Sequence, residues 1–313
     1  MNRLGLLALL SLAACTVEGA DDPTLEDAEA IGFNAIGFNA LVNNALSANQ
    51  AAHRMMTEVP LATGSYDGSV PELADQLHDS LTRQFMKYLV GCALGPDDVV
   101  SYTDRFNLAR YEWKGSLGLC PSWADGPATE ECQQVVSSCL LARNNAFGRT
   151  VQISMRGVDE EGTALPLAPG EAGDFRWREG AFFGNLFVDL VDGVDVYVDS
   201  KGAVQGRAAT KVQGSIYPQM WACWSDVWSW PSAYQSYRVC AGGHTNCAAT
   251  SVGACRATRV PAPDFRCEID DSLPLGDKDY QQCRSNDGRL WHTAMTVFLR
   301  DACDLVPTAC DHF

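Results

Sequence analysis

The sequence lacks the local motifs by which the common enzyme and cofactor classes are recognised. It contains no H-E-x-x-H, no G-x-S-x-G, no Walker loop, no Rossmann glycine fingerprint and no EF-hand loop. Although the chain has 13 cysteines, no two are spaced as Cys-x-x-Cys. The sequence therefore lacks the cysteine spacing that zinc ribbons and c-type haem attachment require. We therefore predict neither a metal nor a cofactor. Any catalytic site must be assembled from residues far apart in the chain.

Basic residues are scarce. The chain has 23 Lys and Arg against 39 Asp and Glu, which gives a net charge of −16. Nucleic acids and anionic lipid headgroups both reward clustered basic residues, so this balance argues against nucleic acid as a partner and against adsorption on anionic headgroups. With 313 residues and 46% apolar content, the chain can bury one large core or two small ones.

Long hydrophobic runs are also missing, and the longest apolar stretch lies at the amino terminus. Arg3 supplies one positive charge and residues 4–14 supply an apolar run that ends in small residues. This pattern predicts a signal peptide, because the run is well short of the ~20 residues that a membrane-spanning helix needs.

The run ends in Leu12-Ala13-Ala14-Cys15, which resembles the lipobox of bacterial lipoproteins. The resemblance implies cleavage before Cys15, acylation of that cysteine and attachment to a membrane through its acyl chains. Thr16 rather than Asp follows, which in such lipoproteins implies an outer-membrane lipoprotein of the cell envelope that faces the periplasm or the surface. The alternative is a soluble secreted protein in which Cys15 is an ordinary cysteine.

The remaining cysteines are even in number, as pairing requires. In an exported chain such a set predicts disulfides rather than metal ligation. Eight of them allow 105 pairings, so we predict none for the eight that follow residue 200. The twelve are Cys92, Cys120, Cys132, Cys139, Cys223, Cys240, Cys247, Cys255, Cys267, Cys283, Cys303 and Cys310.

The gap between Cys139 and Cys223 suggests two modules. We predict a signal peptide over residues 1–14, an acidic tether over 15–29, a pentapeptide-like repeat over 30–50, an α+β module with four cysteines over 51–157 and a β-rich module with eight over 158–313. The repeat resembles pentapeptide β-solenoids, but four copies make one coil. The alternative is a stalk that packs on the next module or forms a helix with residues 51–56.

The four-cysteine module is predicted to contain a helix pair and strands. Ser69-Val70-Pro71-Glu72 has the form of a capping box, and apolar spacing continues to Cys92. A second helix begins at Thr129 and carries Cys132 and Cys139 on one stripe, ~10 Å apart and beyond disulfide reach. We predict the pairs Cys92–Cys139 and Cys120–Cys132. Residues 110–119 and 150–155 alternate as half-buried strands do.

The eight-cysteine module is predicted to be rich in strands and loops. Residues 194–199 alternate, a turn follows at 200–202 and a strand continues to 205, which is typical of a hairpin. A last alternating strand covers residues 293–300. The predicted fold class is therefore α+β, with a disulfide-stabilised second module.

Four of the eight tryptophans lie within ten residues, at Trp221, Trp224, Trp228 and Trp230. Exposed in a row, they could stack on sugar rings or anchor a protein partner. The alternative is that Trp221, Trp224 and Trp228 form one helical face packed in a small core.

Candidates for chemistry are few. His244 and Cys247 are the residue types of a base and a thiol nucleophile, although a bridged Cys247 has no thiolate. Calcium could be held by Asp189, Asp192, Asp195 and Asp199, or these acids could simply point to water. His292 is, with His244, the first suspect for a hydrolase site.

Two further stretches, Leu140-Leu141-Ala142-Arg143-Asn144-Asn145-Ala146-Phe147-Gly148 running on to residue 157, and residues 178–187, resemble uncharacterised Cys-rich lipoproteins of the myxobacterial kind. The resemblance implies no activity. We predict a membrane-anchored extracytoplasmic protein that binds a protein or glycan ligand or has a structural role in the envelope. The alternative is a secreted hydrolase whose active site has no local motif.

Overall fold

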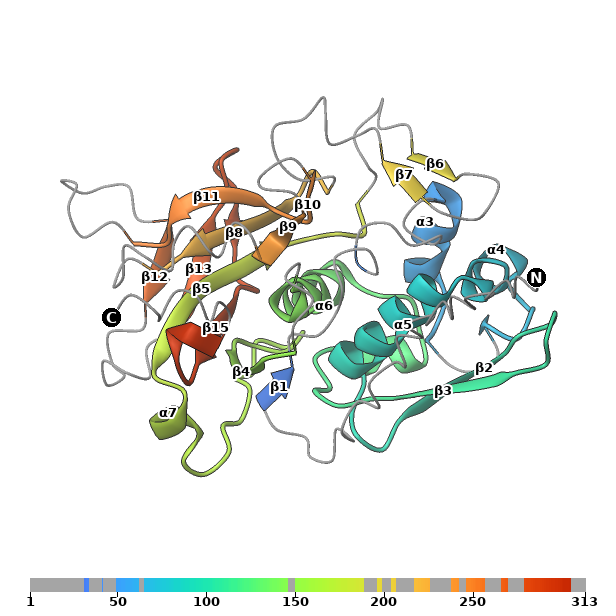
Figure 1. Ribbon diagram of the computed structural model, residues 1–313, viewed down its shortest axis with the longest axis horizontal. Coiled ribbons are helices and arrows are strands. Elements are labelled where there is room, and N and C mark those ends of the chain that lie inside the picture. The colour runs from blue at the N-terminus through green and yellow to red at the C-terminus, as the bar shows by residue number, and fades with distance from the viewer. Residues whose placement is uncertain are drawn as a thin grey trace, which may run out of the picture.

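The computed structural model describes residues 31–33, 41, 49–61, 65–145, 150–188, 196–198, 204–206, 217–225, 238–241, 246–256, 266–269 and 279–304. Its largest element is a six-stranded sheet (Figure 1). The strands are antiparallel except for the last two, which are parallel. Their order is β1 (Ile31–Phe33), β4 (Gln152–Arg156), β15 (Met295–Leu299), β5 (Trp177–Gly184), β8 (Met220–Trp224) and β11 (Thr250–Ala254).

The two faces of this sheet bury different cores, because alternate side chains on a strand point to opposite sides. Phe182 and Ala222 join the large core that includes the helices. Phe183 and Cys223 join a second, smaller core on the other face. Strand β15 is buried along its whole length, as expected of a strand covered on both faces.

One helix covers the first face of the sheet, and a second helix packs behind it. Helix α6 (Glu130–Arg143) lies on β5 and β15, and α5 (Ser80–Ala93) packs against α6 on the side away from the sheet (Figure 1). Thr129 caps α6, since its hydroxyl oxygen accepts the N–H of Cys132 at 3.1 Å. Eleven of the fourteen α6 residues are buried, so α6 is the central helix of the large core.

A β-hairpin packs on α5. Its strands are β2 (Val99–Thr103) and β3 (Arg110–Lys114), which pair over five residues. After β3, the N–H groups of residues 117–120 bond to carbonyls at the end of α5, including Leu119 to Cys92 at 3.1 Å and Cys120 to Ala93 at 2.8 Å. These bonds satisfy carbonyls that a helix end leaves without partners. The predicted strand over 110–119 therefore ends early, at Lys114.

No helix in the described ranges is long and apolar enough to span a bilayer. The remaining described elements are short. Besides the β2–β3 hairpin, three small sheets are described: β6 (Val196–Val198) with β7 (Val204–Gly206); β9 (Cys240–Ala241) with β10 (Asn246–Cys247); and β12 (Cys267–Ile269), β13 (Tyr280–Arg284) and β14 (Leu290–Trp291). The short helices are α3 (Gln50–Glu58), α4 (Pro71–Ala74), η2 (Gln76–His78), η3 (Pro121–Ala124), α7 (Glu171–Asp174) and η5 (Ala302–Asp304).

Four disulfides are described in full, and two of them are the pairs predicted from the sequence. Cys92–Cys139 joins α5 to α6, and Cys120–Cys132 joins the segment after β3 to the first turn of α6. Cys223–Cys255 and Cys267–Cys283 lie side by side in the smaller core, with Cys223 and Cys267 Sγ 3.4 Å apart. Cys247 and Cys303 are also disulfide-bonded, which makes ten of the twelve predicted cysteines; Cys310 and the Cys240 side chain lie outside the described residues.

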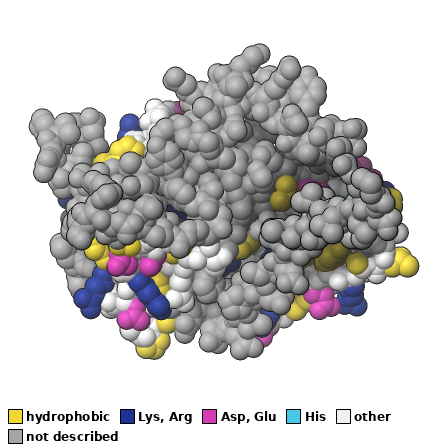
Figure 2. Space-filling view, in the orientation of Figure 1, with side chains coloured by type: hydrophobic (Ala, Val, Ile, Leu, Met, Phe, Trp, Pro, Cys, Tyr) yellow, Lys and Arg dark blue, Asp and Glu magenta, His cyan; other side chains and the backbone are white. Residues whose placement is uncertain are grey.

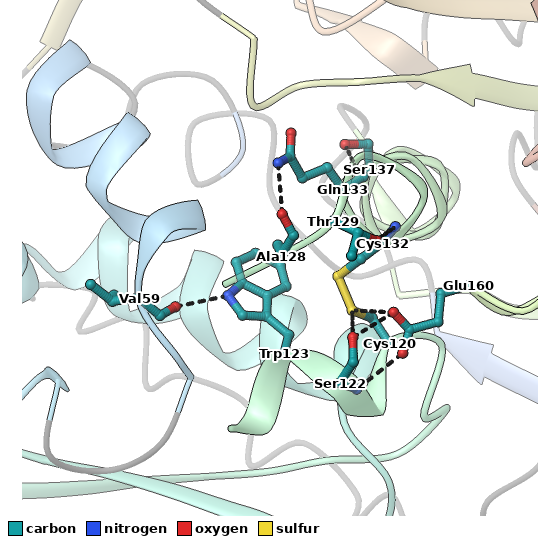
Figure 3. The surroundings of a disulfide bond; sticks show 10 residues. All are labelled: Val59, Cys120, Ser122, Trp123, Ala128, Thr129, Cys132, Gln133, Ser137 and Glu160. Atoms are coloured by element: carbon teal, nitrogen blue, oxygen red, sulfur yellow. Dashed lines mark hydrogen bonds between the residues drawn. A yellow bond between two sulfur atoms is a disulfide. The ribbon is translucent and has the colours of Figure 1, made fainter. Parts of the chain in front are cut away.

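A carboxylate lies against one of these disulfides (Figure 3). Glu160 Oε2 is 3.4 Å from Cys120 Sγ and accepts the Ser122 hydroxyl at 2.6 Å, while Oε1 accepts the Ser122 N–H at 3.0 Å. Cys120, Cys132 and Glu160 have the residue types of a metal site, but both sulfurs are committed to the disulfide. The two sulfurs are therefore not available as metal ligands.

The predicted α+β class is confirmed, and so are the helix from Thr129 and the hairpin that β6 and β7 form. The prediction of one continuous helix from Ser69 to Cys92 is wrong, because this stretch forms three separate helices, α4, η2 and α5. Asp79 starts α5, because its carboxylate accepts the N–H groups of Leu81 and Thr82, both at 3.2 Å. The N-cap of α4 is Val70, without a side-chain capping bond.

The boundary predicted at residue 157 lies within the main sheet. Strands β1 and β4 precede it and the other four follow it, and one core cluster runs from Leu41 to Leu299. Each described disulfide nevertheless closes on one side of the boundary. The two predicted modules therefore share a sheet and a core. In the repeat, only residues 31–33, 41, 49 and 50 are described. Residues 51–56 lie in helix α3, which takes in only Gln50 of the repeat.

Candidate functional site

The most exposed apolar side chains of the described residues lie at the hairpin tip, which we define as residues 104–109 between β2 and β3. Phe106 is 63% exposed and Leu108 is 77% exposed. The next in rank is Val99 at the start of β2, at 52%, and the remaining large exposed hydrophobics are Leu167 and Leu290, at 40% and 39%. Figure 2 shows hydrophobic atoms projecting at the right-hand end of the molecule, where Figure 1 places the hairpin.

The hairpin presents this tip on a packed base. Val100, Tyr102 and Trp113 are buried on its inner face, and the rings of Tyr102 and Trp113 stack with centroids 6.3 Å apart. Arg83 of α5 lies over the Tyr111 ring at 4.5 Å. Burial of these three aromatic or branched side chains fixes the hairpin on α5, and the tip carries its most exposed apolar side chains.

Asp104 holds the tip in one conformation. Its Oδ1 accepts the N–H of Phe106 at 2.8 Å and of Asn107 at 3.4 Å, and its Oδ2 lies 2.9 Å from His78 Nδ1. Backbone bonds between Asp104 and Ala109 (2.8 Å) and from Leu108 to Asp104 (2.7 Å) close the turn. Leu108 has a φ of 58°, a region that side chains other than Gly, Asn and Asp rarely adopt. The exposed Leu108 is therefore held at some conformational cost.

Asp104 is ionised in this setting. Burial works to raise its pKa, but the hydrogen bonds from His78, Phe106 and Asn107 outweigh burial and lower the pKa below its usual range. Burial, with Asp104 as a further cause, raises the pKa of the Tyr102 hydroxyl. A carboxylate only accepts hydrogen bonds, so the proton shared with His78 resides on Nδ1.

His78 is an oriented imidazole at the surface. Its side chain is 56% exposed while that of Asp104 is fully buried. The His78 ring also packs on Phe106, with centroids 4.8 Å apart. A carboxylate that fixes the Nδ1–H tautomer leaves Nε2 to accept a proton or a ligand. Within the described ranges, no hydroxyl or thiol is hydrogen-bonded to His78, so the pair has no adjacent nucleophile there.

Cations flank the apolar side chains. Arg105 pairs with Asp75 and packs over the Phe106 ring at 4.9 Å, and Arg110 pairs with Glu112 at 2.9 Å. All four charged side chains are well exposed. The segment from 105 to 110 thus carries two arginines and no carboxylate, in contrast to the acidic chain as a whole.

The exposed row of tryptophans is wrong where the structure describes it, whereas the alternative is right that Trp221 packs in a small core and wrong that it lies in a helix. Trp221 and Trp224 lie in strand β8, not in a helix, and they point to opposite faces of the sheet. Trp221 is only 8% exposed and belongs to the smaller core, so it cannot be part of an exposed row. Trp228 and Trp230 lie outside the described residues.

The other predicted candidates are not brought together. Cys247 is buried and disulfide-bonded, so it offers no thiolate nucleophile. His292 is exposed, at the end of β14. Outside the described residues lie Cys15, His244, Asp189, Asp192, Asp195 and Asp199.

Our sequence reasoning missed the hairpin tip. The run Val99-Val100-Ser101-Tyr102-Thr103 is rich in β-branched and aromatic residues and does indicate a strand. Asp104 and Asn107 are turn-forming types, so a hairpin over residues 99–114 had a local signal. No local signal links His78 to Asp104, because 26 residues separate them.

Comparison with known proteins adds no relative. No protein-family model, no curated protein and no solved structure matches the chain.

Proposed function

We propose that the protein is a membrane-anchored extracytoplasmic lipoprotein with a binding or envelope-structural role, and that the hairpin tip is its contact surface. One observation carries the contact surface: Phe106 and Leu108 are largely exposed on a turn that a buried carboxylate holds in place. Exposing two large apolar side chains in a fixed conformation is costly for a solitary protein and favourable where a partner covers them.

Two features of the chain support export, namely its amino-terminal segment and its disulfides. Arg3, the apolar residues 4–14 and Cys15 have the order that lipoprotein processing requires. The ten disulfide-bonded cysteines suit an oxidising compartment, where such bonds persist. An outer-membrane location follows only from Thr16 and belongs to the same proposal.

A hydrolase is the second candidate, because of one observation. His78 has the carboxylate-oriented ring that a general base needs, and Nε2 faces away from Asp104 at the surface. A substrate with a reactive carbonyl or a bound water would have to supply the other groups.

The first experiment is the intact mass of protein purified from native membranes, with and without reduction and alkylation. The proposal predicts a mass that starts at an acylated Cys15, and twelve cysteines that alkylate only after reduction. Release of a Cys15→Ala variant from the membrane fraction is the matched control. An unacylated, soluble chain would contradict the anchor.

A second experiment addresses the contact surface. A photo-crosslinking side chain placed at Phe106 should yield adducts in intact cells, and the same side chain at Leu290, an exposed leucine on β14, should not. Equal labelling at both positions would contradict a specific contact at the tip. Loss of hydrolytic activity in a His78→Asn variant, against a panel of ester and peptide substrates, would favour the second candidate instead.

A further inference from the structure

We infer that the partner of the hairpin tip is the lipid bilayer itself, with Phe106 and Leu108 inserted into the interfacial layer of the membrane that anchors the chain. This inference rests on the proposed function and names the chemistry of its contact surface. The shape, the flanking charge and the effect of tethering each support it.

The shape of the hairpin tip favours a bilayer over a small molecule as its partner. Small-molecule sites are concave and enclose most of the ligand. The hairpin tip is convex: Phe106 and Leu108 project from a turn whose backbone is closed by the bond from Asp104 to Ala109. A projecting apolar turn needs a partner that can deform around it, as the boundary between headgroups and acyl chains does.

The flanking charges suit lipid phosphates. Arg105 and Arg110 bracket the two apolar side chains, and a guanidinium has five N–H donors, more than one carboxylate uses. Their partners, Asp75 and Glu112, are exposed, and exposed ion pairs are readily exchanged for other anions. Arginine stems can also lie along apolar surface while the head group reaches the interface.

The net charge of −16 limits the contact to this tip. An acidic surface is repelled by anionic headgroups, so the rest of the molecule gains nothing by adsorbing. We therefore expect apolar insertion rather than charge to drive the contact, and we expect it on zwitterionic bilayers and at high salt.

Tethering makes so small a contact sufficient. A single acyl chain gives only marginal membrane binding, and two side chains bury less apolar surface than one such chain. A protein already held at the membrane meets it at a high effective concentration, so weak insertion is enough to fix its orientation. The tip would thus orient the anchored protein on its membrane and direct His78, which packs on Phe106, towards the headgroups.

The test uses the mature chain with a hexahistidine tag in place of Cys15. It is bound to phosphatidylcholine and phosphatidylethanolamine vesicles that contain a chelating lipid, so that contact is measured whether or not the native chain is acylated. Tryptophan is introduced as Phe106→Trp, or as Leu290→Trp for the control, and emission is compared with that of the parent, which already has eight tryptophans. Lipids brominated near the headgroup boundary should quench the emission added at position 106 at least about twofold, since interfacial side chains lie ~5–10 Å deep.

The emission added at position 290 should be unchanged by brominated lipid. Equal quenching at the two positions, or none at either, on protein shown to be vesicle-bound overturns the inference. A Phe106→Ser/Leu108→Ser variant gives an independent reading: when the chelating lipid is dilute, its retention on vesicles should fall about fivefold, and a Leu167→Ser/Leu290→Ser variant should be retained like the parent. Failure of the anchor would show in the intact mass, which the tip does not affect.

Discussion

Arg238 and Glu179 form an ion pair in which both side chains are almost wholly buried, at 0% and 2% exposure. Glu179 lies at a β-bulge in β5, where Arg178 and Gly180 oppose consecutive residues of β15. The Arg238 guanidinium also bonds to the carbonyls of Ala142 and, at 2.9 Å, Asn144, at the end of α6. One side chain thus connects the sheet to the central helix.

Breaking this pair should destabilise the protein strongly. An Arg238→Met variant leaves the Glu179 carboxyl group, whose pKa burial raises, buried without its partner, and we expect a loss of about 3–5 kcal/mol in the free energy of unfolding. Urea unfolding followed by tryptophan fluorescence would measure it. A Glu179→Met/Arg238→Met double variant should lose less than the sum of the single losses. Additive losses would contradict an energetic coupling between the two side chains.

The tip should lose its fixed conformation in acid. The pKa of Asp104 is lowered in the folded state, so its contribution to stability is present above the ordinary Asp pKa of ~3.9 and is lost as the pH falls through the folded value. Amide exchange at Phe106 and Asn107 should therefore accelerate below about pH 4 relative to that of the core strands. An Asp104→Asn variant should show fast exchange at neutral pH as well, whereas Asp125→Asn, at an exposed position, should not. Unchanged protection in Asp104→Asn would show that the backbone bonds alone hold the turn.

The two disulfides of α6 should differ in their contribution to stability. Cys92–Cys139 closes 47 residues and Cys120–Cys132 closes 12, so in the chain-entropy account their loss costs about 4 and about 3 kcal/mol respectively. Paired alanine substitutions and urea unfolding would measure both. A larger loss for Cys120–Cys132 would mean that contacts around that bridge, such as those of Glu160, outweigh loop closure.

Glu160 should protect its neighbouring disulfide from reduction. A carboxylate 3.4 Å from Cys120 Sγ repels an approaching thiolate. Glutathione should therefore reduce Cys120–Cys132 on the order of 3- to 10-fold faster in a Glu160→Gln variant than in the parent protein. Mass mapping of alkylated cysteines over time would follow each bridge, with Cys92–Cys139 as the internal reference. The neighbouring, exposed Glu161→Gln is the matched control. Equal rates for Glu160→Gln and the parent would contradict charge protection.

The sequence by itself determined the features that depend on neighbouring residues or on counting. Thr129 and the acids after it predicted α6, because capping is settled within one turn. The helical spacing of Cys132 and Cys139 excluded a bond between them, and the two predicted bridges are present. The break in the helix predicted from Ser69 to Cys92 could not be seen in the apolar spacing. Asp79 starts a new helix there because its carboxylate accepts backbone N–H groups, and the spacing of apolar residues does not record such bonds.

Only the tertiary structure decided how distant segments meet. The position of β15 between β4 and β5 brings together strands more than 100 residues apart, and no local pattern encodes such neighbours. The same holds for Trp221, which the packing of β8 buries, and for His78 and Asp104, which the docking of the hairpin on α5 brings within 2.9 Å. Local hydrogen bonds and cysteine number can be read along the chain, whereas burial and side-chain pairing depend on which surfaces finally pack.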